Sequence, residues 1–266
     1  MIPKIIHYCW FGGNEIPEKE QKCINSWKKF CPDYKIIEWN ETNYDIGKNI
    51  YIKQAAEAKK WAFVSDYVRL DVIYQFGGIY LDTDVEVIRS LDPLLKHKAF
   101  AGMENVIGEE FSITTGSGFG AEKQNPIIDA WRKEYDTLIF RHSNGTEDLL
   151  TTPARTTAYM KSLGFQQKNV LQEINGMVIY PTDYFSPKQY NTGKIVITDN
   201  TYSIHHYSES WKTDDQKKKN EEWLRLRNKY GESRAELIMA IKDKYKEGGM
   251  INIFLSAIGM IFNRKK

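Results

Sequence analysis

The chain has 266 residues, enough to bury one large core with or without an appendage. Its formal net charge is only +2, so nothing in the charge calls for a nucleic-acid partner and we expect none. Three cysteines, Cys9, Cys23 and Cys31, are an odd number without Cys-x-x-Cys spacing, so we expect neither disulfides nor a zinc site, and we expect a reducing cytoplasmic compartment.

The N-terminal part alternates strand-like and helix-like segments. Residues 2–10 predict a strand that ends in a loop at Trp10–Gly13, residues 17–30 predict a helix, and residues 34–39 predict a second strand. This alternation favours an α/β fold with a mainly parallel sheet. We expect no signal peptide, since the first strand starts at once, and no apolar run reaches the ~20 residues that span a bilayer.

A long amphipathic helix is predicted over residues 53–76, with Gly77 as its capping glycine. Asp66 and Arg69 are spaced i and i+3, and Ser65 and Arg69 are spaced i and i+4, so the three cluster near one face. They could form a surface ion pair of little energetic value. We favour a functional site, because this charged pair falls on an otherwise apolar stripe.

The most informative pattern follows this helix. Residues 79–81 predict a short buried strand, and Asp82 and Asp84 leave it two residues apart, so both carboxylates point to the same side. Two carboxylates this close repel unless a cation lies between them. Mg²⁺ or Mn²⁺ suits these oxygen ligands and would then meet a diphosphate. The pattern points to an enzyme that handles a nucleotide-sugar.

The central segments are less distinctive. Residues 85–88 predict a strand, and the Gly- and Thr-rich residues 99–120 predict a loop that is not a phosphate loop, because no Gly-Lys-Ser/Thr follows. Residues 126–141 predict a helix. Another helix is expected to begin with Thr152 as its cap and Pro153 in the first position, followed by strands at 177–180 and 195–198.

A second polar patch covers residues 203–211, where His205 and His206 stand at the end of a strand-like run. A lone histidine is usually structural, but one that lies beyond a carboxylate pair can be a third metal ligand. The spacing does not choose between His205 and His206.

The C-terminal region differs in composition from the rest. Residues 212–247 are highly charged and predict solvated helices, whereas residues 248–266 form an apolar segment with a basic end. Such a tail can lie in a membrane interface or pack on the domain, and we favour the interface because its apolar face is broad.

Four segments then occur in a characteristic order: residues 5–13, 62–69, 77–84 and 205–211. With them, residues 1–211 resemble bacterial members of glycosyltransferase family 32, the DXD-containing sugar transferases. These are similar to fungal Golgi mannosyltransferases and, more distantly, to glucosylating toxin domains. The resemblance implies a GT-A catalytic domain, a nucleotide-sugar donor, Mn²⁺ or Mg²⁺, and retention of anomeric configuration. This chain has Glu209-Ser210-Trp211 where the family often has Gly-Ser-Trp.

The resemblance also implies residue roles. Trp10 would lie near the nucleotide base, Asp66 and Arg69 would hold sugar hydroxyls and diphosphate, and Asp84 would bind the metal. The implied catalytic residues are Asp66, Arg69, Asp82 and Asp84. The implied donor-binding residues are Trp10, Ser65, Asp66, Arg69, Tyr80, Asp82, Ser210 and Trp211. The implied metal ligands are Asp82, Asp84 and His205.

The function implied is transfer of a hexose to a saccharide or lipid-linked saccharide in capsular polysaccharide synthesis, with peripheral contact to the inner membrane face. The toxin-like start at Trp10–Gly13 favours a UDP-sugar, with GDP-mannose as the second option. A non-catalytic carbohydrate-binding protein is one alternative. A haloacid-dehalogenase-type phosphatase is the other, but its motif requires Thr or Val where this chain has Glu86.

Overall fold

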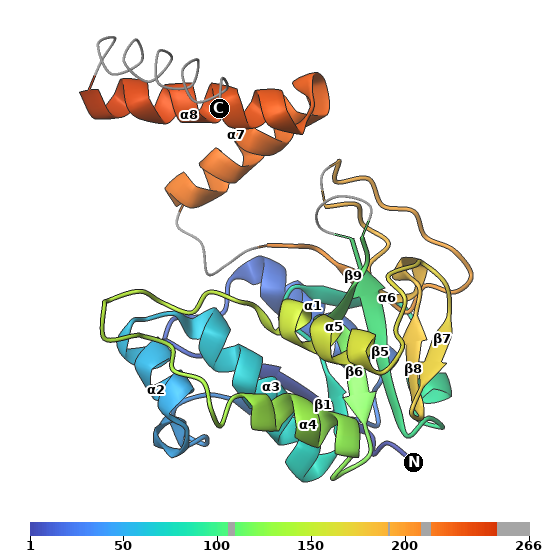
Figure 1. Cartoon of the computed structure of the whole chain (residues 1–266). Coiled ribbons are helices and arrows are strands. Elements are labelled where there is room, and N and C mark those ends of the chain that lie inside the picture. Colours follow the sequence, from blue (N-terminus) through green and yellow to red (C-terminus); the bar gives the residue numbers. More distant parts are fainter. Residues whose placement is uncertain (106–109, 191, 209–213, 249–266) are drawn as a thin grey trace. The chain divides into compact units, whose positions relative to one another are not determined.

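The computed structural model describes residues 1–105, 110–190, 192–208 and 214–248. The chain divides into two compact units, Met1–Trp211 and Lys212–Lys266 (Figure 1). Each unit is described separately below.

The first unit is built on a seven-stranded sheet (Figure 1). In spatial order its strands are β2 (Lys35–Trp39), β1 (Ile5–Cys9), β3 (Gly78–Tyr80), β6 (Ser112–Ala121), β5 (Ala99–Glu104), β8 (Met177–Tyr180) and β7 (Gln172–Ile174). Strands β6 and β7 run against the other five. The carboxyl ends of β1, β3, β5 and β8 therefore share one edge of the sheet, where polar loop residues can meet.

Helices cover both faces of this sheet, confirming the predicted α/β architecture. The helical segments are α1 (Glu18–Phe30), η1 (Ile46–Lys48), α2 (Ile50–Glu57), α3 (Trp61–Phe76), η2 (Asp92–Leu94), α4 (Pro126–Glu134), α5 (Thr152–Ser162) and α6 (Thr182–Phe185). Alternate strand residues enter two separate cores: Ala101 packs with residues of α2 to α5, and Phe100 packs with residues of α1 and α6.

The single helix predicted over residues 53–76 is wrong, because the segment contains two helices. Helix α2 ends at Glu57, and Lys59 takes a left-handed conformation with φ of 56°. The Lys60 N–H then bonds to the Ala55 carbonyl at 2.8 Å and the Lys59 N–H to Ala56 at 2.9 Å. This is a Schellman closure, which ends a helix even where the left-handed residue is not glycine.

Helix α3 is also less amphipathic than predicted. Residues 66–73 are buried without interruption, including Asp66, Arg69 and Asp71. The helix lies between the sheet and helices α2 and α4, so it has little solvent face. Gly77 does cap its C-terminus, with φ of 67° and its N–H bonded to the Ile73 carbonyl.

The loop predicted over residues 99–120 is wrong as well, since most of this stretch forms β5 and β6 in the middle of the sheet. Its glycines make room for a neighbour. A Cβ atom on Gly102 or Gly118 would lie 2.8 or 2.9 Å from the ring of Phe185. Glycine in a strand commonly marks such a close approach. A glycine-rich strand is therefore easily mistaken for a loop when only its composition is known.

Three smaller expectations also fail. The helix predicted over 126–141 ends at Glu134. Thr151, not Thr152, is the cap residue of α5, and the Thr152 hydroxyl is hydrogen-bonded to the Tyr135 hydroxyl. Residues 195–198 form no strand; Ile195 makes an isolated bridge to Lys188. A second, two-stranded sheet joins β4 (Val85–Val87) to β9 (Ser203–His205).

The second unit contains helices α7 (Asp214–Tyr230) and α8 (Glu232–Gly248). Leu226, Ala235 and Met239 form its small core. The predicted apolar tail, apart from its first residue, lies outside the described residues. Among the residues that the structure describes, no helix is both long and apolar enough to cross a membrane.

Candidate functional site

The Asp82–Asp84 segment leaves β3 at the shared sheet edge. It forms a turn rather than a strand, in which the Val85 N–H bonds to the Asp82 carbonyl at 3.0 Å. The expectation that a strand points both carboxylates to one side is therefore wrong, whereas their binding of one cation stays a prediction. The turn gives each carboxylate its own partners, one on α3 and the other on β9.

Asp82 belongs to a buried cluster around Arg69. The Arg69 guanidinium lies 3.2 Å from a carboxylate oxygen of Asp82 and 3.2 Å from one of Asp66. It also stacks over Tyr80, whose hydroxyl donates to Asp82 at 3.1 Å. Burial raises the pKa of Asp82, and the positive charge of Arg69 opposes this rise. The cluster therefore holds one buried guanidinium between two carboxylates.

The remaining predicted residues on α3 frame this cluster. The other oxygen of Asp66 accepts the Thr152 N–H at 3.1 Å, which ties α3 to the start of α5. Ser65 contributes its main-chain carbonyl, which accepts from Arg69 Nε at 3.1 Å. The structure thus brings Asp66, Arg69 and Asp82 together, with Ser65 beside them.

Gly116 is a site residue that the sequence did not indicate. Its carbonyl accepts the Asp82 N–H at 2.8 Å, and a Cβ at this position would lie 2.0 Å from an Asp82 carboxylate oxygen. Its neighbour Thr115 accepts weakly from Arg69 at 3.5 Å. Gly116 lies 34 positions from Asp82 in the numbering, and only the β3–β6 pairing brings them together.

Asp84 faces the second sheet. The register of β4 and β9 places His205 opposite Val85, so His205 Nε2 lies 3.3 Å from Asp84 Oδ1. The Ser208 N–H donates to the other Asp84 oxygen at 2.7 Å. Burial opposes charge on both groups, but their mutual attraction prevails: the pKa of Asp84 falls to about 2 and that of His205 rises to about 10.

The two histidines have different surroundings. His206 bonds through Nε2 to the half-exposed Glu86 at 2.9 Å, whereas His205 lies beside Asp84. His205 Nδ1 is buried and makes no hydrogen bond within the described residues. It faces the buried Glu104, 3.7 Å away, and the Tyr207 ring lies 4.2 Å from the imidazole ring. Glu104 is a further residue that the sequence did not indicate.

The donor set around Asp84 fits a hard divalent cation. A carboxylate oxygen and an imidazole nitrogen 3.3 Å apart can bind one ion, and Mn²⁺ accepts both ligand types. No group of three or more acidic, histidine or cysteine side chains gathers for a metal within the described ranges. Magnesium-type sites often use one or two protein ligands and complete their shell with phosphates and water. Asp82 pairs with Arg69 here, and its role as a third metal ligand stays a prediction.

Trp10 lies at the carboxyl end of β1, on the same sheet edge. It is partly buried, and its indole N–H donates to the Asn14 carbonyl at 2.7 Å. Two predicted donor-binding residues, Ser210 and Trp211, lie outside the described residues.

A family model described as a glycosyltransferase sugar-binding region containing a DXD motif matches residues 17–101. This stretch includes Asp66, Arg69, Asp82 and Asp84, whereas His205 lies outside it. Over these residues the chain resembles the sugar-binding region of DXD-containing glycosyltransferases. The predicted family resemblance is thus confirmed.

Curated relatives of this chain include inositol phosphoceramide mannosyltransferase 3 of Schizosaccharomyces pombe, which is 37% identical over 111 residues, or 37% of this chain and 29% of the relative. Mannosyl phosphorylinositol ceramide synthase SUR1 of Saccharomyces cerevisiae is 36% identical over 41% of this chain and 29% of its own length. The chain thus spans under a third of these relatives. A solved glycosyltransferase involved in glycosylating the major capsid of PBCV-1 aligns with a TM-score of 0.45 and 12% identity, over 79% of this chain and 95% of that one.

Proposed function

We propose that the protein is a retaining, metal-dependent glycosyltransferase that moves a hexose from a nucleotide-sugar to a saccharide or lipid-linked saccharide. The observation that carries this proposal is the Asp84–His205 pair at the sheet edge, next to the Arg69 cluster. Negative charge develops on the leaving diphosphate as the sugar–phosphate bond breaks. A cation held by Asp84 and His205, together with the Arg69 guanidinium, would stabilise that charge.

The chain's own residues have distinct parts in this mechanism. Asp84 and His205 would hold the cation, which stabilises diphosphate charge when bound. Arg69 is held by Asp66 and Asp82 with little freedom, so it can bind phosphate or sugar oxygens without reorganising. Asp82, raised in pKa by burial, can accept a hydrogen bond from a sugar or ribose hydroxyl.

Retention of configuration requires either a covalent intermediate or attack from the face of the leaving group. We propose same-face attack, in which a leaving phosphate oxygen takes the acceptor proton. Asp66 and Asp82 both pair with Arg69, so neither is a free nucleophile. A glycosyl–enzyme adduct trapped in a mass spectrum would overturn this part of the proposal.

The donor has two candidates. The toxin-like Trp10–Gly13 segment favours a UDP-hexose, and the mannosyltransferase names of the relatives favour GDP-mannose. Both belong in the first assay.

We further propose a role in surface polysaccharide synthesis at the cytoplasmic face of the membrane. The three cysteines are free and buried, as a reducing compartment allows. The apolar sequence of residues 248–266 supplies the proposed peripheral membrane contact.

The test is turnover of UDP-hexoses and GDP-mannose with Mn²⁺ or with EDTA, measured as nucleotide released without acceptor. We expect slow hydrolysis of one donor, abolished by EDTA and reduced about a hundredfold or more by Asp84→Asn. The matched control is Asp129→Asn on α4, which should hydrolyse the donor at the wild-type rate. No release and no thermal shift with any donor would instead support a binding-only protein.

A further inference from the structure

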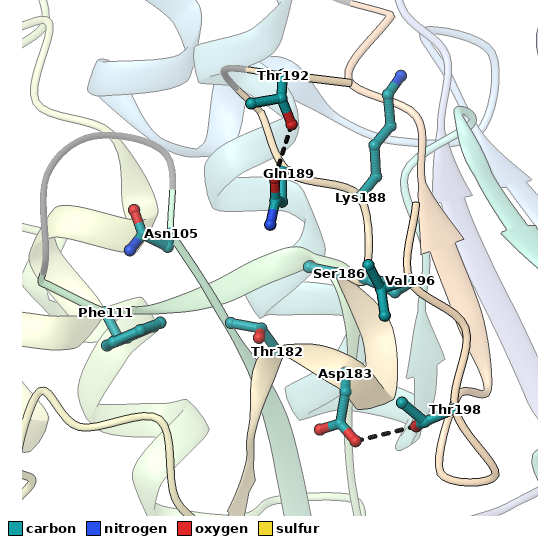
Figure 2. A pocket seen from close by; sticks show the side chains of 11 residues that line it. Asn105, Phe111, Thr182, Asp183, Ser186, Lys188, Gln189, Thr192, Val196 and Thr198 are labelled. Atoms are coloured by element: carbon teal, nitrogen blue, oxygen red, sulfur yellow. Dashed lines mark hydrogen bonds between the residues drawn. The ribbon is translucent and has the colours of Figure 1, made fainter. Parts of the chain in front are cut away.

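A pocket opens beyond the carboxyl ends of β5 and β8, on the same sheet edge as the Asp84–His205 pair (Figure 2). Its volume is about 520 Å³, within the range of small-molecule sites. Asn105 follows β5, Phe111 precedes β6, and the remaining walls come from α6 and the chain that follows it. Neither predicted cluster of donor residues lies in this pocket.

The pocket shares two walls with the Asp84–His205 pair. Asn105 directly follows Glu104, which faces His205. On the other side, the Lys188 ammonium donates to the main-chain carbonyl of His206 at 2.5 Å. Lys188 is half-buried, and its pKa is lowered by burial while Asp84 opposes this shift. A molecule in the pocket would thus lie next to the place where the diphosphate is proposed to leave.

The lining suits a molecule with many hydroxyl groups. It is dominated by amide and hydroxyl side chains, with Phe111 as its aromatic surface for the apolar face of a sugar ring (Figure 2). Ser186 is only 6% exposed, and its hydroxyl lies close to the phenol of Tyr207, so it contributes to the pocket wall.

The rim of the pocket is apolar, in contrast to its polar lining. Val196 lines the pocket, and it lies in a run of three exposed apolar residues, Ile195, Val196 and Ile197, that are 42%, 45% and 58% exposed. On the α6 side, Asn169 exchanges two hydrogen bonds with Thr182, and the next residues, Val170 and Leu171, are 53% and 58% exposed. Exposed apolar side chains are normal singly, but a run of three at the rim of a polar pocket indicates contact with an apolar group.

We propose that this pocket is the acceptor site, and that the acceptor is a saccharide attached to an apolar chain. The hydroxyl-rich head would enter between Asn105, Phe111 and Ser186, and the apolar part would leave across Ile195–Ile197. This inference rests on the proposed function and adds the substrate class. The proposed acceptor site also agrees with same-face attack. An acceptor in this pocket would lie beside the Asp84–His205 pair, where the leaving diphosphate is proposed to bind.

The test compares binding of methyl and octyl glycosides of glucose, galactose and mannose, below the micelle concentration, by ligand-observed NMR without donor. We expect one sugar head to bind, with the octyl form at least about tenfold tighter than the methyl form. Ile197→Ser should remove most of this octyl preference, whereas Asn105→Ala should weaken both forms alike. Ile50→Ser, at an exposed isoleucine on α2, is the matched control and should keep the preference.

Transfer is then measured with the best glycoside and the active donor. Asn105→Ala should lower the ratio of transfer to hydrolysis. The proposal is overturned if no glycoside binds, or if Ile197→Ser keeps the full octyl preference. Failure of the wild type to release nucleotide from any donor would count against the proposed function instead, because glycoside binding is measured without donor.

Discussion

At the scale of single residues, Glu104 gives His205 its orientation. Nδ1 faces the Glu104 carboxylate at 3.7 Å and Nε2 faces Asp84 at 3.3 Å, so the imidazole lies between two acidic side chains. A carboxylate behind a ligating histidine fixes the tautomer and leaves the other nitrogen for the ion. Glu104 thus acts through His205 and is a positioning residue.

Glu104→Gln should weaken Mn²⁺ binding about tenfold or more while the protein stays folded, because an outer-shell partner of a histidine ligand is lost. The measurement is Mn²⁺ affinity by electron paramagnetic resonance, with circular dichroism as the check on folding. Glu86→Gln is the matched control, since Glu86 contacts His206. Equal Mn²⁺ affinities for wild type and Glu104→Gln would show that Glu104 has no positioning role.

At the scale of elements, His7 joins three segments at the back of the site. Its Nδ1 accepts from the Trp39 indole at 3.0 Å and its Nε2 bonds to the Gly77 carbonyl at 2.9 Å, which links β1 to β2 and to the end of α3. A neutral imidazole has one accepting and one donating nitrogen, so both of its hydrogen-bonding groups have a partner here. Burial lowers the pKa of His7 to about 4, because a charged ring here would lack water and a partner for its extra proton.

His7 should therefore make the protein less stable in mild acid. The unfolded chain binds a proton near its ordinary pKa of 6.5 and the folded chain only near 4, so the stability contribution is complete above pH 6.5 and is lost as the pH falls towards 4. The loss should approach about 3 kcal/mol. Urea unfolding from pH 7 to 4 should show a steeper loss for wild type than for His7→Gln. Parallel curves for the two proteins would contradict this assignment.

At the scale of the whole molecule, the two units carry different parts of the proposal. Both clusters and the pocket lie within Met1–Trp211, whereas the apolar residues proposed to meet the membrane belong to Lys212–Lys266. Chemistry and attachment should then be separable by deletion.

A chain that ends at Gly248 should leave the membrane fraction and keep its activity on soluble acceptors, because the apolar residues 249–266 are lost. The measurement is the share of protein recovered with sedimented membranes, beside a turnover assay. The control is the 266-residue chain with Asp129→Asn, which is prepared and fractionated in the same way but keeps the apolar residues 249–266. Unchanged recovery with membranes after the deletion would remove the anchor from the proposal.

The sequence by itself determined the local features: the strand–helix alternation, the Gly77 cap, and the ordered segments, Asp82-Thr83-Asp84 among them, that carry the family resemblance. These depend on residues a few positions apart, which periodicity and capping reveal. Only the tertiary structure decided the partners of the two carboxylates and the parts of Glu104 and Gly116, because strand order and register bring distant residues together. It also decided that residues 99–104 and 112–121 are strands, since the fit of Phe185 against glycine has no local signal.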